Sequence, residues 1–245
     1  MTLQGVIFDL GGTLVEYGGP RDWEWPGLEA FRQALEGFGY RAPATETLLA
    51  VHERRITNLY QRLEEDPDAT QTQDQIFGAM LAEAGITLSQ AQWDEARARY
   101  YYACREHIRV VPHAQEMLKA VSARGLRLAA ASNTHWPGVE IDRFLDDLGI
   151  GAYVPARFYS ADEAAWKPWP GLLQRALAAI DLPPDAVAYV GDLPQYDVRA
   201  ARRAGMRAVW LNRRDAAVMD GLTPDATIRA LPELLDVVDR WVGAP

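Results

Sequence analysis

Residues 3–14 read LQGVIFDLGGTL, and this stretch decides how the rest of the chain is interpreted. The apolar run at 6–8 is typical of a buried strand in a parallel sheet. Asp9 follows this run directly, and the two glycines after Leu10 allow the backbone to fold tightly around a ligand. Because ligands bind at the carboxyl ends of strands in open α/β sheets, Asp9 is a candidate for chemistry. The alternative is an aspartate that caps the next turn.

The composition of the 245 residues is that of an ordinary globular protein, with 49% hydrophobic and 24% charged residues. The net charge of -9 argues against general affinity for nucleic acid or for an anionic membrane surface. No stretch reaches the roughly 20 apolar residues of a membrane span, and no secretory signal is evident. Cys104 is the single cysteine, so an intramolecular disulfide is excluded and a cytoplasmic location is expected.

Hydrophobic periodicity divides the chain into an α/β part and a helical part. Strands expected at 126–131 and 187–190 alternate with helices, which predicts a parallel sheet covered by helices on both faces. After the first strand the apolar residues instead follow helical spacing in four successive stripes. We therefore expect a Rossmann-like α/β core formed by 1–17 and 108–245, with an inserted α-helical domain at 18–107.

Polar residues stand at, or just beyond, several expected strand ends: Asp9, Ser132 with Asn133, Lys167, and Asp192 with Asp197. In a parallel sheet these ends share one edge, so the side chains are expected to converge. Taken singly, Ser132 is explained as a helix cap and Lys167 as a solvated surface lysine. Together, carboxylates at one spot repel one another unless a cation lies among them, and hard oxygen ligands suit Mg2+. A lysine and a hydroxyl beside that cation suit a phosphoryl group, and a carboxylate can attack phosphorus.

This set of residues resembles the motifs of the haloacid dehalogenase superfamily of hydrolases, in its phosphatase-like form. The first motif is similar to residues 8–14, the second to 131–133, the third to 166–168 and the fourth to 190–197. All four occur in the order and spacing of the family. The helical insert that follows the first motif resembles the family's C1 cap.

The resemblance implies Mg2+-dependent hydrolysis of a small phosphorylated metabolite, a phosphate monoester, through an aspartyl-phosphate. Asp9 would be the nucleophile, with Lys167 and Ser132 as further catalytic residues. The ligands of Mg2+ would be Asp9, the carbonyl of Gly11, Asp192 and, in support, Asp197. The phosphoryl group would be held by Ser132, Asn133, Lys167 and Gly11.

The sequence departs from the family's pattern at Gly11, where phosphatases of the superfamily usually carry a second aspartate. That aspartate protonates the leaving oxygen, so its absence predicts low efficiency, at a cost of roughly 10²–10⁴ in rate. Dehalogenases and phosphonatases share this absence. The aspartates of the fourth motif argue against a metal-free dehalogenase. A phosphonatase needs a reactive cap lysine, and no lysine occurs between residues 18 and 107.

Two alternatives to the phosphatase stay open. One is a dehalogenase-type hydrolase that uses Asp9 on carbon, and the other is a catalytically weak phosphate-binding or interaction protein on the same scaffold. Magnesium dependence separates the phosphatase from the first, and turnover separates it from the second. Candidates to replace the missing acid are Glu16, Tyr17, His113 and His135. The sequence identifies neither the substrate nor the oligomeric state.

Overall fold

The computed structural model describes residues 2–217 and 221–243, which fall into two compact units. Unit 1 contains the described residues of Met1–Glu16, Leu63–Thr70 and Val110–Pro245, and unit 2 contains Tyr17–Arg62 and Gln71–Arg109. The short segment Leu63–Thr70 therefore belongs to unit 1, although the helices before and after it belong to unit 2. That residues 18–107 act as a cap stays a prediction.

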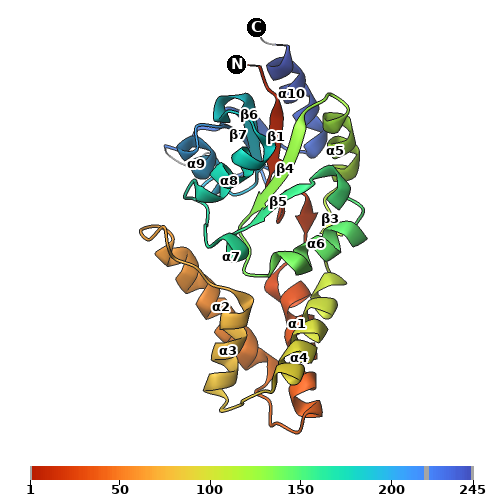
Figure 1. Cartoon of the computed structure of the whole chain (residues 1–245), viewed down its shortest axis with the longest axis vertical. Helices are drawn as coiled ribbons and strands as arrows, with labels where there is room; N and C mark the ends of the chain where they lie inside the picture. The colour runs from red at the N-terminus through yellow and green to blue at the C-terminus, as the bar shows by residue number, and fades with distance from the viewer. Residues whose placement is uncertain (1, 218–220, 244–245) are drawn as a thin grey trace. The chain divides into compact units, whose positions relative to one another are not determined.

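Unit 1 is built around a parallel sheet (Figure 1). Among the described residues its strand order is β5-β4-β1-β6-β7-β8. The strands are β1 Gly5–Phe8, β4 Arg127–Ser132, β5 Ala156–Tyr159, β6 Val187–Gly191, β7 Arg207–Leu211 and β8 Ala226–Ile228. This arrangement confirms the expected α/β fold class with a parallel sheet. The edge strand β8 had no expected counterpart, because its three residues are too few to show a periodic pattern.

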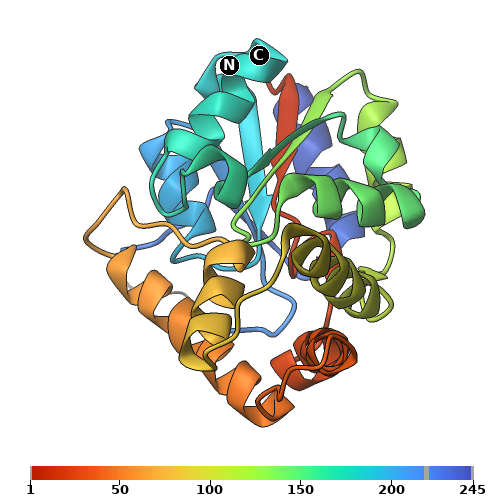
Figure 2. The same ribbon diagram turned by 60° about the horizontal axis from the view of Figure 1, so that its bottom comes forward.

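Helices cover both faces of the sheet in unit 1, with α8 and α9 on one face and α5, α6 and α10 on the other (Figures 1 and 2). The bounds are α5 Ala114–Ser122, α6 Gly138–Asp147, α7 Ser160–Glu163, α8 Gly171–Ile180, α9 Asp197–Arg203 and α10 Leu234–Val242. Successive residues of β1 point to opposite faces, and Val6, Ile7 and Phe8 are all fully buried. This two-sided burial explains the continuous apolar run in the first strand.

The register of the sheet determines which residues can meet at its carboxyl edge. Phe8, the last residue of β1, pairs with Ala130 of β4 and with Val190 of β6. The residues that follow in these three strands therefore emerge side by side at one edge. Asp9 is tied to the neighbouring strand by its own amide, which donates to the carbonyl of Val190 at 2.9 Å.

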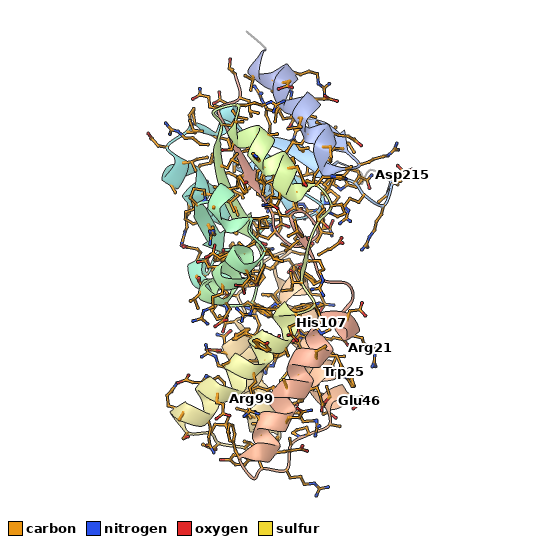
Figure 3. All side chains as sticks on the ribbon, turned by 90° about the vertical axis from the view of Figure 1, so that its right-hand side faces the viewer. Arg21, Trp25, Glu46, Arg99, His107 and Asp215 are labelled. Carbon is orange, nitrogen blue, oxygen red and sulfur yellow. The ribbon has the colours of Figure 1, made fainter. Side chains whose placement is uncertain are left out.

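Unit 2 consists of helices, namely α1 Pro20–Gly37, α2 Thr45–Arg62, α3 Gln73–Glu83 and α4 Gln90–Arg105. Its interior contains the aromatic residues of the expected stripes. The Phe31 and Phe77 rings stack with centroids 4.3 Å apart, and Tyr100 meets Phe77 edge-on at 4.8 Å. Near the start of α1, the Arg21 guanidinium lies 5.2 Å from the centre of the Trp25 ring (Figure 3). The aromatic residues of these stripes therefore pack against one another inside unit 2.

Two short strands, β2 Val15–Glu16 and β3 Arg109–Val110, form a separate two-stranded sheet. Within the described ranges, no helix is both long and apolar enough to cross a membrane.

Candidate active site

The turn after β1 is tightly closed and presents Asp9 at the edge of the sheet. The carbonyl of Leu10 accepts hydrogen bonds from the amides of Thr13, Leu14 and Val15 at 3.1, 2.8 and 2.9 Å. Gly12 has a φ of +77°, and a Cβ at this position would lie 2.3 Å from Oδ2 of Asp192. Glycine is therefore required at position 12 for the carboxylate of Asp192 to reach the turn.

Lys167 is the cation of this site and is almost completely buried, with 1% of its surface exposed. Its Nζ lies 2.9 Å from Oδ1 of Asp9, 2.7 Å from Oδ1 of Asp197 and 2.7 Å from the hydroxyl of Tyr189. Burial acts to lower the pKa of this ammonium, but the carboxylates of Asp197 and Asp9 hold it well above its usual value. Lys167 is thus an ammonium that donates hydrogen bonds to Asp197 and Tyr189 and forms an ion pair with Asp9.

Tyr189 belongs to the site but was not singled out in the sequence, because it lies within the buried strand β6 and reads as a core residue. Its hydroxyl accepts from Lys167 and donates to the carbonyl of Ala131 at 2.7 Å. Burial keeps the pKa of this phenol well above its usual value, so it stays protonated and able to donate. A tyrosine in an otherwise aliphatic strand was the available signal, since a buried hydroxyl needs a partner.

Carboxylates are concentrated at the same edge. Oxygens of Asp9, Asp192 and Asp197 lie within 4.8 Å of one another. Asp197 is held by two contacts, since its Oδ1 accepts from Lys167 and its Oδ2 accepts from the amide of Leu193 at 2.8 Å. Asp9 and Asp192 differ from Asp197, because each has a buried Oδ1 without a hydrogen-bond partner. One ammonium thus faces three carboxylates.

The electrostatics of the cluster follow from this imbalance. Burial, together with the charges of Asp9 and Asp197, raises the pKa of Asp192 to about 8. Burial also raises the pKa of Asp197 to about 6, although Lys167 acts against it. A divalent cation among these oxygens would remove the repulsion and would satisfy the unpartnered oxygen of Asp192. The oxygen-only donor set fits a hard cation such as Mg2+.

Ser132 and Asn133 come from the end of β4, next to β1 in the sheet. Ser132 is buried as the last residue of that strand. The side chain of Asn133 holds the backbone of the Lys167 loop on both sides, because its Nδ2 donates to the Lys167 carbonyl and its Oδ1 accepts from the Lys167 amide, each at 2.8 Å. Gly11 is half-buried in the turn and pairs with Val15 in an isolated bridge.

The candidate replacements for the missing acid lie in different places. Glu16 forms an ion pair with Arg213 at 2.8 Å in unit 1. Tyr17 belongs to unit 2 and packs its ring against Trp23 at 4.9 Å. His113 precedes α5 with a left-handed φ of 65°. The ion pair of Glu16 and the ring contact of Tyr17 do not involve Asp9, and the roles of all four candidates, His135 included, stay predictions.

Comparison of the chain with models of known protein families identifies its family. A model of the haloacid dehalogenase-like hydrolases matches residues 3–205, which include all four motifs. The chain therefore belongs to this family and is a hydrolase.

Relatives of known activity include both phosphatases and a dehalogenase. A phosphoserine phosphatase of Thermus thermophilus is 31% identical over 66% of this chain, and the match covers 63% of that protein, less than two thirds of its length. A phosphoglycolate phosphatase of Shigella sonnei is 28% identical over 95% of this chain and 91% of that protein. The solved structure of a 2-haloacid dehalogenase from Pseudomonas syringae pv. Tomato DC3000 covers 98% of this chain and 99% of its own, with 26% identity and a TM-score of 0.75.

Proposed function

We propose that the protein is a Mg2+-dependent phosphohydrolase that acts on a small phosphate monoester through an aspartyl-phosphate at Asp9. The observation that carries this proposal is the group of three carboxylates within 4.8 Å, matched by one lysine and containing a buried oxygen without a partner. Such a group suits a divalent cation, whereas a dehalogenase that works without metal has no need of it. The phosphatase relatives support the same reaction class.

In this proposal, Asp9, Asp192 and the Gly11 carbonyl would hold Mg2+, with Asp197 in support. The cation would offset negative charge on the phosphoryl group and draw it toward the nucleophile. Lys167 neutralises Asp9 and Asp197, and its hydrogen bonds go to Asp197 and Tyr189 within the protein. Lys167 therefore acts on the reaction mainly through its charge and by orienting Asp9. Ser132, with nearby backbone amides, would hold phosphoryl oxygens.

The reaction would proceed in two displacements. A carboxylate oxygen of Asp9 bonds to phosphorus while the ester P–O bond breaks, and the alcohol oxygen leaves with the bonding electrons. Water then cleaves the acyl phosphate, which releases inorganic phosphate and restores the carboxylate of Asp9. Because residue 11 is glycine, no carboxylic acid at that position protonates the departing oxygen. We therefore expect aryl and acyl phosphates, whose leaving groups are weak bases, to be favoured over alkyl phosphates.

Residues 18–107 would act as a cap that carries substrate selectivity. The existence of unit 2 as a compact helical body supports this assignment. The substrate would be a small phosphorylated metabolite, and a cytoplasmic location fits such a substrate.

A dehalogenase is the second candidate, because the chain shares the fold of a 2-haloacid dehalogenase over almost its full length and lacks the acid at position 11. The deciding experiment assays wild type and Asp9→Asn on p-nitrophenyl phosphate and on 2-chloropropionate, each with Mg2+ or with excess chelator. We expect phosphate release that needs both Mg2+ and Asp9. Chloride release that persists in chelator would instead establish the dehalogenase. Absence of both activities would favour a binding protein.

A further inference from the structure

A segment of the helical insert is anchored beside Lys167. This segment, Leu63–Thr70, is named the strap here, and it joins α2 to α3 while belonging to unit 1. Its two ends are buried at Leu63 and Ala69, whereas most residues between them are exposed. The strap is therefore held at its ends.

Each end of the strap accepts one hydrogen bond from an indole. Nε1 of Trp169 donates to the carbonyl of Leu63 at 3.0 Å, and Nε1 of Trp166 donates to Oγ1 of Thr70 at 3.1 Å. These two tryptophans flank Lys167 and Pro168 in the chain. The strap thus contacts the residues on both sides of the lysine.

The same loop also has contacts outside the strap. Asn133 binds the backbone of Lys167 on one side. Arg203 donates to the carbonyl of Pro168 at 3.1 Å, and its guanidinium lies 4.3 Å from the centre of the Trp169 ring. Removal of the strap contacts would deprive both indole N–H groups of these acceptors and would weaken the attachment of the loop on both flanks of Lys167.

Small displacements of this loop would change the rate of the proposed reaction, because the loop sets the position of the Lys167 ammonium. The ammonium must at once donate to Asp197 and Tyr189 at 2.7 Å and lie 2.9 Å from Oδ1 of Asp9. A shift of about 1 Å in a positioned catalytic group can cost about 10²-fold in rate.

We propose that the strap is a positioning element for Lys167, and that Trp166 and Trp169 are the positioning residues through which it acts. This inference rests on the proposed function for its effect on turnover. The insert then helps to position the catalytic lysine, in addition to any role it has in substrate selection.

The test uses the full-length protein and two readouts. Thr70→Val removes the acceptor of the Trp166 indole at nearly constant volume, and Thr70→Ser restores a hydroxyl. Trp169→Phe removes the donor to Leu63. Trp241→Phe is the matched control, because Trp241 lies far from the Lys167 loop. Its carbonyl accepts a hydrogen bond from the amide of Leu3, just before β1 and therefore at the amino end of the strand, opposite the carboxyl end that leads to Asp9.

The first readout is amide hydrogen exchange in the peptide that spans 164–170, which does not depend on any activity. We expect exchange at least about fivefold faster in Thr70→Val and Trp169→Phe, and within about twofold of wild type in Thr70→Ser and Trp241→Phe. Unchanged exchange in Thr70→Val and Trp169→Phe would overturn the inference.

The second readout is p-nitrophenyl phosphate hydrolysis. We expect kcat to fall about tenfold in Thr70→Val, with KM changed less than about threefold. In a Lys167→Met background, the Thr70 substitution should change the residual rate less than about twofold, because its effect passes through the lysine. An equal loss in both backgrounds, or an unchanged kcat, would refute positioning of Lys167. Absence of turnover in wild type would count against the proposed function alone, and hydrogen exchange would then decide whether the strap anchors the loop.

Discussion

The ammonium of Lys167 lies 2.7 Å from the phenolic oxygen of Tyr189, which in turn donates to the carbonyl of Ala131 at 2.7 Å. This chain of two hydrogen bonds links the lysine of the third motif to the strand that ends at Ser132. Tyr189 is therefore the neutral partner that completes the surroundings of Lys167, beside the carboxylates of Asp9 and Asp197.

Replacement of Tyr189 by phenylalanine removes the hydroxyl and leaves the ring in the core. A hydrogen bond to a charged group contributes about 1.5–3 kcal/mol, so Tyr189→Phe should lower kcat roughly 10- to 100-fold. Tyr159→Phe, on the edge strand β5, is the matched control, since the Tyr159 hydroxyl donates to Asp142 of α6. Steady-state kinetics on p-nitrophenyl phosphate measure the difference. A wild-type kcat in Tyr189→Phe would mean that the two carboxylates suffice to hold the lysine.

Metal binding is tested at Asp192, whose Oδ1 is buried without a hydrogen-bond partner. Asp192→Asn should weaken Mg2+ binding at least about tenfold and reduce turnover, because an anionic ligand is lost. Calorimetric titration with Mg2+ measures the first effect, and rate against Mg2+ concentration measures the second. Asp185→Asn, an exposed change just before the start of β6, is the control. Equal Mg2+ affinity in Asp192→Asn and wild type would contradict the assignment.

The two adjacent glycines of the turn should respond in opposite ways to aspartate. Gly11→Asp installs the missing acid and should raise turnover of alkyl phosphates about tenfold or more, with less gain on aryl phosphates. Gly12→Asp should abolish Mg2+ binding, because its Cβ would lie 2.3 Å from Oδ2 of Asp192 in a backbone conformation with φ of +77°. The measurement is the turnover of alkyl and aryl phosphates by Gly11→Asp, after the variant has been shown to be folded and to bind Mg2+. No gain on alkyl phosphates would indicate that another residue already supplies the proton.

Glu24 in unit 2 predicts a pH dependence of stability. It is fully buried, accepts a hydrogen bond from Tyr100 at 2.5 Å, and burial raises its pKa from 4.5 to about 8. The folded state therefore binds more protons than the unfolded state between these two values. The stability from protonated Glu24 is full below pH 4.5 and is lost as the pH rises toward 8, by up to about 1.4 kcal/mol per pH unit.

Glu24→Gln removes this titration. Urea unfolding at pH 5, 6, 7 and 8 should show the variant gaining stability relative to wild type as the pH rises. Glu46→Gln, an exposed change in the first turn of α2 (Figure 3), should follow the wild-type curve. A constant difference between Glu24→Gln and wild type at all four pH values would show that Glu24 is not protonated in the folded protein.

Much of the core was predictable because its residues repeat in local patterns. The apolar run before Asp9, the expected strands at 126–131 and 187–190, and the helical stripes of the insert each show a pattern that burial imposes on neighbouring residues. The convergence of strand-end residues was also predictable, since parallel strands present their carboxyl ends at one edge. The structure brings Asp9, Lys167, Asp192 and Asp197 together at that edge.

By itself, then, the sequence determined the fold class, the motif positions and the cluster of charge, because these depend on local periodicity and on the rules of parallel sheets. Only the tertiary structure decided which residues complete the surroundings of Lys167. Tyr189 reads as core in the sequence, and Leu63 reads as the end of a helical stripe, although α2 ends at Arg62. Trp169 and Leu63 are 106 positions apart, and their hydrogen bond exists only because folding returns the strap to unit 1. No local pattern encodes such a contact.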